Sequence, residues 1–411
     1  MSKPILSALA LAGCGLSLAA HADVEVAPNT TIGSRAYLDF GNISNKQNSN
    51  LPNETNVAPT GTGFDVKRFY LIVDHKFNDV WSANLTTDAQ YVAAPSTITS
   101  TVNSTTGAVT STTSTSNSGS VSEVFIKKLY LQAKLDDAFI VRAGSYDMPW
   151  APFVESLYGY RWIEKTATDR LGFANTADWG VNAGGTFGTS GVSYAVSAVD
   201  GGGFKNPTRT KTVDVEARVS YVPIEGLSIA IGGYRGHLGQ VTVANENFAQ
   251  NTASRLDAAI GYTVAGFRVG GEYVKAKNYK TVNNVGASVF GTSAVVASSA
   301  TALVNSDEAT GGSVWASYAF TDQYSVFARA DDFKLSKDIA RDLKDKYFDV
   351  GVAYKPIKNV DVGLVYKYEK VEHGTATISG ADANGSYVIG GSSGDNDGKF
   401  SEVGLYLQYS F

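Results

Sequence analysis

From near its N-terminus to its last residue, this chain alternates apolar and polar side chains with a period of two. The final segment, SEVGLYLQYSF, shows the pattern clearly. One face of it carries Val403, Leu405, Leu407, Tyr409 and Phe411. Successive side chains of a β-strand point to opposite faces, so the segment predicts a strand with one apolar and one polar side.

Similar segments recur along the chain, and we count about sixteen of them. Short connections lie at 77–79, 136–137, 188–191, 223–226, 263–266, 321–323 and 356–359, and long polar ones at 41–63, 92–120, 149–177, 236–252, 277–311 and 370–398. Short and long connections that alternate between amphipathic strands are typical of outer-membrane barrels. The sequence therefore predicts an all-β fold, a transmembrane antiparallel β-barrel with short periplasmic turns and long external loops.

Residues 1–22 have the pattern of an export signal, with Lys3, an apolar stretch and a final Ala20-His21-Ala22 site. The only cysteine, Cys14, lies inside this segment, so the chain without it can form no disulfide. Leu11-Ala12-Gly13-Cys14 also resembles a lipoprotein box, which leaves a lipid-bearing Cys14 as an alternative. Residues 23–411 are then predicted to be a single barrel domain, located in the outer membrane of a Gram-negative bacterium.

Aromatic side chains gather next to the short connections. They include Tyr221, Tyr262, Phe267, Phe320, Tyr324, Tyr354 and Phe411. Rings at one depth on successive strands form the girdle of a membrane interface, whereas a soluble core would place rings in mid-strand. We therefore expect the apolar face to meet outer-membrane lipid.

The last strand is expected to pair with the first, because an open sheet edge cannot exist in hydrocarbon. Phe411 would then belong to the girdle at the inner rim. In outer-membrane barrels generally, a C-terminal strand that ends in Phe is read by the barrel assembly machinery, and this strand looks like one. Phe411 is accordingly our candidate assembly residue.

The other face of the strands carries charges of both signs. The candidate lumen-wall residues are Arg35, Asp39, Arg68, Asp88, Lys128, Arg218, Arg255, Arg268 and Arg329. A sealed interior would strand such groups at several kcal/mol each, so we expect a water-filled lumen. For any single charge the alternative is a cross-strand pair that stiffens the wall.

Catalytic chemistry has little support in the sequence. The chain after the signal has three histidines, His75, His237 and His373, none spaced for metal ligation. No sequence context supports a nucleophile with a base. We therefore expect no enzyme activity, no metal and no cofactor, and the acidic net charge of −5 gives no reason to expect nucleic acid as a partner.

The third long connection, 149–177, is dense in aromatic and charged residues. A loop in solvent rarely carries so many large rings, which here are Trp150, Phe153, Tyr158, Tyr160, Trp162 and Phe173. We expect this third loop to fold into the lumen and narrow the pore.

Three stretches carry a resemblance to a known family: VRAGSYDMPW, ESLYGYRWIEKTATDRLGF and FDVKRFYLIVDHKFND. They resemble the family of phosphate-selective porins O and P. The resemblance implies a sixteen-stranded homotrimeric porin with its third loop in the lumen and basic residues at the constriction. The corresponding basic positions are Arg142, Arg161, Lys165 and Arg170, with Asp147, Glu155, Glu164 and Asp169 interleaved.

The expected function is passive diffusion of small hydrophilic solutes or ions through an outer-membrane pore, with anions such as phosphate among the candidates. The alternative is an outer-membrane structural protein or adhesin whose barrel does not conduct. A sealed or plugged interior would distinguish that alternative from a pore.

Overall fold

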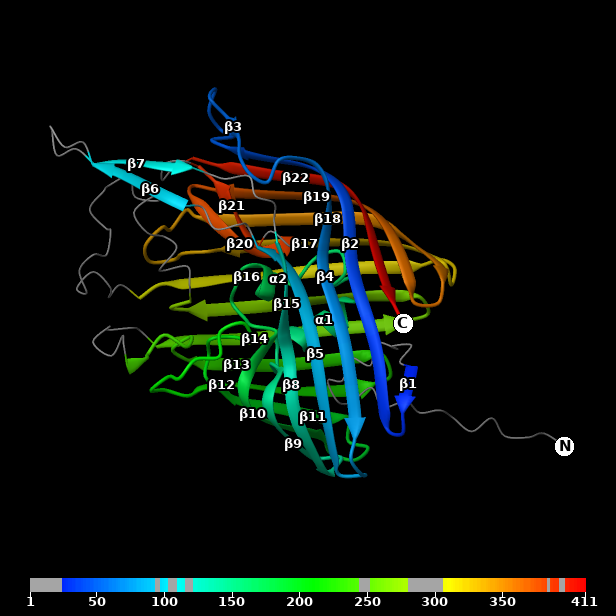
Figure 1. Cartoon of the computed structure of the whole chain (residues 1–411). Coiled ribbons are helices and arrows are strands. Elements are labelled where there is room, and N and C mark those ends of the chain that lie inside the picture. The colour runs from blue at the N-terminus through cyan, green and yellow to red at the C-terminus, as the bar shows by residue number, and fades with distance from the viewer. Residues whose placement is uncertain are drawn as a thin grey trace.

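The computed structural model describes residues 24–92, 97–102, 109–114, 121–243, 252–279, 306–382, 385–391 and 396–411. Sixteen antiparallel strands form a closed barrel (Figure 1). They are β2 (Thr30–Gln47), β4 (Gly61–Lys76), β5 (Trp81–Val92), β8 (Val121–Asp136), β9 (Phe139–Asp147), β10 (Ala177–Thr186), β11 (Val192–Val199), β12 (Asp214–Ile224), β13 (Leu227–Gly236), β14 (Ala253–Val264), β15 (Phe267–Lys277), β16 (Glu308–Ala319), β17 (Tyr324–Lys334), β18 (Lys344–Ile357), β19 (Val360–Glu372) and β22 (Gly398–Ser410). The predicted fold class is confirmed. The proposed signal, 1–22, lies outside the described residues.

The barrel closes where the last strand meets the first. Strand β22 pairs with β19 on one side and with β2 on the other, with Leu405 opposite Phe40. The backbone of Phe411 exchanges two hydrogen bonds with Ser34, of 2.8 and 3.2 Å. Closure gives the backbone groups of the two edge strands hydrogen-bond partners, which lipid cannot supply. For this reason we had expected the last strand to pair with the first.

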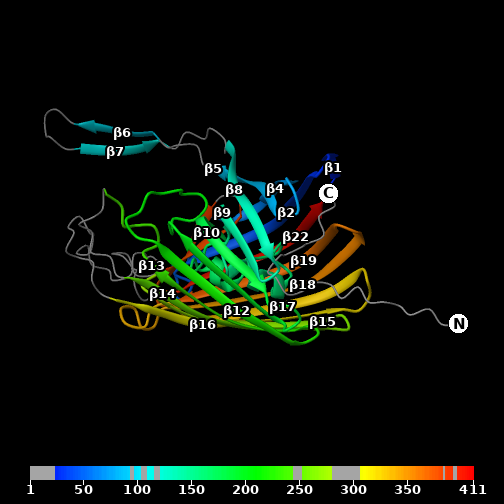
Figure 2. The ribbon, with the colours of Figure 1, turned by 90° about the horizontal axis from the view of Figure 1, so that it is seen from below.

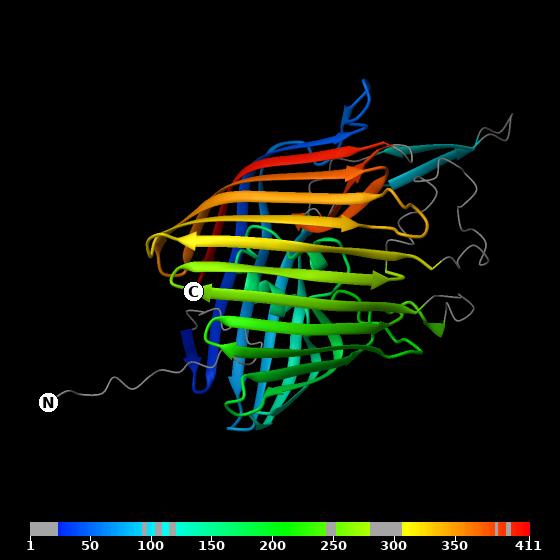
Figure 3. The same cartoon turned by 180° about the vertical axis from the view of Figure 1, so that it is seen from behind.

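Short connections lie at one end of the barrel and long ones at the other. All seven predicted short connections join neighbouring strands as tight turns. The described N-terminal strand β1 (Val24–Ala27) and Phe411 lie at the end with these turns (Figure 3). Within the described part of the chain, no helix is both long and apolar enough to cross a membrane.

A few shorter elements are not among the sixteen barrel strands. Strand β3 (Thr55–Asn56) pairs with β2 at the end with the long loops. Two hairpins lie in long loops, β6 (Thr97–Val102) with β7 (Val109–Ser114) and β20 (Thr375–Asp382) with β21 (Gly385–Gly390). The β6–β7 hairpin stands clear of the barrel (Figure 2). Two helices, α1 (Ala151–Tyr158) and α2 (Ala167–Arg170), lie within the ring of strands.

The two faces of the wall differ as the alternation predicts. On β12, Val215 and Val219 are exposed on the outside, whereas Asp214 and Glu216 are buried inside. Aromatic side chains above the tight turns also face outward, and the rings of Phe267 and Tyr318 stack with centroids 4.2 Å apart. An apolar exterior with a ring of aromatic side chains fits a lipid environment.

Deleting Phe411 should lower the yield of assembled barrel several-fold while export continues. Its side chain is about half exposed on the outer surface, and its backbone completes the pairing to Ser34. Removing it leaves Ser34 without these partners at the closing seam. The measurement is the amount of heat-modifiable barrel in the membrane fraction relative to total exported chain. A normal yield of assembled barrel would contradict the assignment of Phe411 to assembly.

Candidate functional site

The connection between β9 and β10, residues 148–176, folds inside the barrel and carries α1 and α2. Proline in the first turn suits the start of α1, because it needs no backbone donor there. Gly159 ends α1 with φ of 81°, a left-handed conformation that favours glycine. The chain therefore reverses at Gly159 and returns across the lumen.

Helix α1 is held by apolar packing. Trp150, Val154 and Tyr158 are buried against Ala230, Ala259 and Trp315 of the wall. Glycines in the wall leave room for this contact, because a Cβ at Gly232 would lie 2.6 Å from the Trp150 ring. The small residues of β13 and β14 thus form the surface on which α1 packs.

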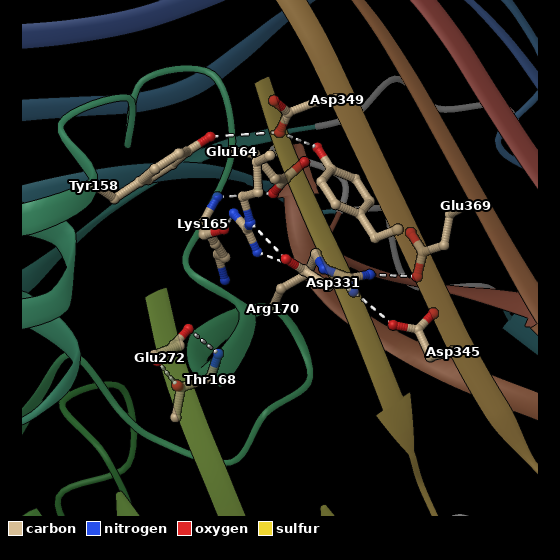
Figure 4. Close-up of polar contacts among 12 residues, drawn as sticks. Tyr158, Glu164, Lys165, Thr168, Arg170, Glu272, Asp331, Asp345, Asp349 and Glu369 are labelled. Carbon is tan, nitrogen blue, oxygen red and sulfur yellow. Dashed lines mark hydrogen bonds and ion pairs between the residues drawn. The ribbon is translucent and has the colours of Figure 1, made fainter. Parts of the chain in front are cut away.

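Helix α2 is held by charge. The Arg170 guanidinium lies between Asp331, Asp345 and Glu369, which come from β17, β18 and β19 (Figure 4). The Asp345 carboxylate is 2.6 Å away, and the Tyr347 ring lies beneath the guanidinium at 4.5 Å. Arg170 is fully buried. These contacts make Arg170 the polar anchor of the third loop.

Further polar contacts hold residues 163–168 of the loop. Lys367 donates to the Ile163 carbonyl at 3.0 Å and to Glu164 at 2.9 Å. The Arg329 guanidinium donates to the Lys165 carbonyl, and Thr168 donates to Glu272 (Figure 4). The loop is therefore fixed to the wall on several strands at once.

Two of the interior cavities, called here the inner and outer chambers, lie on either side of this loop. A third cavity, of about 890 Å³, lies beside β2 and β4 and is bordered by Asp39, Asp65, Lys67 and Glu402 among others. The inner chamber, toward the tight turns, has a volume of about 900 Å³ and is bordered by Arg35, Arg268, Lys355 and Glu155 among others. The outer chamber, toward the long loops, measures about 450 Å³ and is bordered by Arg68, Asp88, Lys127, Lys165 and Lys205 among others. Arg161 borders both chambers. Its side chain therefore lies between the two chambers.

Basic residues outnumber acidic ones in both chambers. The outer chamber has five, Arg68, Lys127, Arg161, Lys165 and Lys205, against Asp88 and Asp169. The inner chamber also has five, Arg35, Arg161, Arg268, Lys355 and Lys358, against Glu155, Asp322 and Asp361. A surplus of one sign inside low-dielectric walls raises the local concentration of the opposite ion.

The charges near Arg161 form a chain of contacts. Arg161 lies 2.6 Å from Glu155 and 3.7 Å from Asp169, which in turn is 3.4 Å from Lys165. Burial lowers the pKa of Lys165 to about 8, and the neighbouring Arg68 and Arg161 act in the same direction. Lys165 is therefore a basic group of the outer chamber whose charge changes with pH near neutrality.

The eight residues expected at a constriction separate into two groups. Glu155, Arg161, Lys165 and Asp169 border the chambers. Arg170 and Glu164 do not border either chamber, since both are buried in contacts with the wall. Arg142 and Asp147 border a separate void of about 50 Å³, where Asp147 pairs with Lys128 at 2.5 Å. Arg170, Glu164, Arg142 and Asp147 each have a partner in the wall or on a neighbouring strand.

The expected lumen-wall residues divide in the same way. Arg35, Arg68, Asp88 and Arg268 border the chambers. Arg218 donates to the Pro149 carbonyl at 2.9 Å, and Arg329 donates to the Lys165 carbonyl, so both hold the third loop. Arg255 pairs with Glu216 at 2.7 Å and thereby joins two strands of the wall. Asp39 pairs across the strands with Lys67 at 3.0 Å. The interior is thus less open than the expected water-filled lumen, because the third loop packs against much of it.

The outer chamber contains two basic residues that the alternation did not identify, Lys127 and Lys205. The β5–β8 register shifts between Thr86 and Thr87, so that Lys127 has no partner opposite it. Such a bulge places two successive residues on one side of the sheet. Lys205 lies in a connection whose path no strand pattern predicts. Among the described residues no cluster of His, Cys, Asp or Glu could hold a metal ion.

No family model and no curated protein sequence matches this chain. Solved structures do match it in fold. The anion-selective porin from Comamonas acidovorans has a TM-score of 0.57 at 13% identity, over 93% of this chain and 100% of that one. OmpF of Salmonella typhi, solved with daunomycin, has a TM-score of 0.54 at 12% identity, over 95% and 100%. The outer membrane channel DcaP of Acinetobacter baumannii has a TM-score of 0.53 at 12% identity, over 94% and 99%. This chain therefore shares the fold of multi-pass outer-membrane barrels.

Proposed function

We propose that this protein is an outer-membrane channel through which small hydrophilic solutes diffuse passively, with anions preferred. The observation that carries the proposal is that Arg161 borders both chambers, so that one basic side chain lies between the two compartments. The shared fold with outer-membrane porins supports the channel part of the proposal.

The charge distribution supports the anion preference. An anion that enters either chamber meets more basic than acidic side chains, and it passes Arg161 between them. In a narrow passage a single charge acts more strongly than in an open lumen, because less water screens it. Phosphate is among the anions that this surplus would admit. The homotrimer implied by the family resemblance remains a prediction.

Planar bilayer recordings test the proposal directly. The mature protein should give discrete conductance steps, and a KCl gradient should give a reversal potential with the sign of chloride preference. A reversal potential of the opposite sign would contradict the anion preference. An absence of any conductance from correctly folded protein would contradict the channel.

One observation favours the alternative of a non-conducting structural barrel. The third loop is packed into the lumen by buried Trp150 and buried Arg170, and the two chambers lie on either side of it. If this packing seals the barrel, bilayers that contain folded protein should stay silent. Because both chambers border Arg161, we expect instead that ions pass between them and that the conductance is small but measurable.

Anion preference should fall by about two- to threefold between pH 6.5 and pH 9.5. The pKa of Lys165 is lowered to about 8, so its ammonium is charged below this pH and neutral above it. One unit charge about 8 Å away in a water-like medium is worth roughly 0.5 kcal/mol. The measurement is the reversal potential as a function of pH. Lys165→Gln should lower the preference at pH 6.5 and reduce its change with pH, although burial also lowers the pKa of Lys205 in the same chamber. An undiminished pH dependence in this variant would contradict the assignment.

A further inference from the structure

We propose that the outer chamber is a binding site for carboxylates that carry a flat apolar body, such as aromatic monocarboxylates. The inference rests on the function proposed above, because it assumes that solutes enter the outer chamber from outside. It goes further by assigning a ligand class to the chamber.

Lys127 supplies the anchor for the carboxylate. Its ammonium donates to the Tyr70 hydroxyl at 3.1 Å and lies over the Tyr70 ring at 4.6 Å. Among the described residues no carboxylate lies within salt-bridge distance of Lys127, although Arg68, Arg161 and Lys165 in the same chamber each have an acidic partner. An ammonium has three donors, so Lys127 keeps donors that a bound carboxylate can accept.

Aromatic rings lie directly beside this anchor. The Phe204 ring borders the outer chamber and stacks on Phe125 with centroids 5.8 Å apart. Lys127 lies 5.9 Å from the centroid of Phe204, and Lys205 lies 4.6 Å from that of Phe125. A ligand whose carboxylate contacts Lys127 can therefore place a flat body against Phe204. Offset stacking of that kind is favourable beyond the burial of area alone.

Part of the remaining lining, which is otherwise largely polar, also suits an apolar body. Leu171, Leu335, Leu343 and Ala376 contribute to the chamber wall. The volume of about 450 Å³ falls within the roughly 300–1,000 Å³ range of small-molecule sites. An inorganic anion would have to lose water to these apolar groups without gaining contacts from them. A carboxylate with an apolar body gains contacts from both parts of the lining.

Isothermal titration calorimetry on the mature chain folded in detergent micelles tests the inference. Benzoate is the probe, acetate has the charge without the ring, and benzyl alcohol has the ring without the charge. We expect benzoate to bind at least about tenfold more tightly than acetate, benzyl alcohol or inorganic phosphate. Equal affinity for benzoate and acetate, or tighter binding of phosphate, would overturn the inference.

Two variants identify the site, and they are accompanied by a control and a reserve variant. Lys127→Gln should weaken benzoate binding by about tenfold or more, as expected for the loss of a charged hydrogen bond. Phe204→Ala should weaken benzoate but leave the weak binding of acetate unchanged. Lys334→Gln is the matched control, since Lys334 is exposed at the end of β17 and outside the chamber. If Lys127→Gln fails to fold, Lys205→Gln provides a second test of the charge in this chamber. Lys205 lies in an exposed part of a loop, where a substitution is well tolerated.

Failure of this inference is distinguishable from failure of the proposed function. Calorimetry in detergent requires no ion current, and the reversal potential requires no benzoate binding. An anion-selective channel that does not bind benzoate would overturn only the ligand assignment. Benzoate binding that is unchanged in both Lys127→Gln and Phe204→Ala would also overturn it, because the ligand would then lie elsewhere.

Discussion

Replacing Arg161 by Glu should shift the anion-to-cation permeability ratio by at least about tenfold toward cations. The change removes one positive charge and adds one negative charge at the position that borders both chambers. At about 4 Å each unit charge is worth roughly 1 kcal/mol even in a water-like medium, and more where water is excluded. The measurement is the reversal potential in a KCl gradient, with the unfolding midpoint recorded for the same protein.

Lys334→Glu is the control for Arg161→Glu. It makes the same change of charge at the exposed outer end of β17, where salt screens it within about 10 Å at 0.1 M. Arg161→Gln should give an intermediate shift, and it avoids placing a third carboxylate beside Glu155 and Asp169. An unchanged reversal potential in well-folded Arg161→Glu would show that ions do not pass Arg161.

Replacing Arg170 by Gln should destabilise the barrel by about 3–5 kcal/mol, the cost of removing one partner from a buried ion pair. The guanidinium is enclosed by Asp331, Asp345 and Glu369, and all four side chains are fully buried. Without it, Asp345 and Glu369 lose their cationic partner, while Asp331 retains Arg329 at 2.7 Å. The measurement is the denaturant midpoint of the folded protein in micelles.

Lys46→Gln is the control for Arg170→Gln. Lys46 also contacts a carboxylate at 2.6 Å, that of Glu54, but both side chains are about 40% exposed. Its loss should leave the midpoint nearly unchanged, since exposed pairs contribute little. Adding Asp345→Asn and Glu369→Gln to Arg170→Gln should recover part of the lost stability, because no charge is then stranded. An unchanged midpoint in Arg170→Gln would contradict its role as an anchor.

The two arginines thus differ in what they are expected to control. Both lie in the third loop, and the sequence treats them alike as basic residues of a constriction. The structure places Arg161 beside both chambers and Arg170 inside the wall contacts. Mutation of Arg161 should therefore change selectivity more than stability, and mutation of Arg170 should do the reverse.

Sequence alternation located the strands and the turns because the constraint is local. A strand that separates lipid from a polar interior must change face at every residue, so Asp214 and Val215 could be assigned to opposite sides from the sequence alone. The tight turns at 223–226 and 263–266 were equally recognisable, since they interrupt that pattern. Closure of β22 on β2 followed from the exclusion of open edges in lipid.

At two β-bulges a strict period of two assigns a side chain to the wrong face. Lys67 on β4 and Lys127 on β8 lie where the register shifts by a residue, and both side chains point into the interior beside Arg68 and Lys128. A strict period of two assigns one residue of each pair to the lipid side. The bulge depends on how neighbouring strands pair, and that pairing is not encoded in the strand's own pattern.

The barrel and its charged interior could be predicted from the alternation of side chains along each strand, and the arrangement of turns and loops from the lengths of the connections. Which charges border the chambers and which hold the loop could be seen only in the folded protein. The reason is that Arg170 meets carboxylates from three strands, whereas Arg161 meets Glu155 and Asp169 of its own loop. The contacts of Arg170 join residues that are far apart in the chain, and they form only once the third loop has folded against the wall.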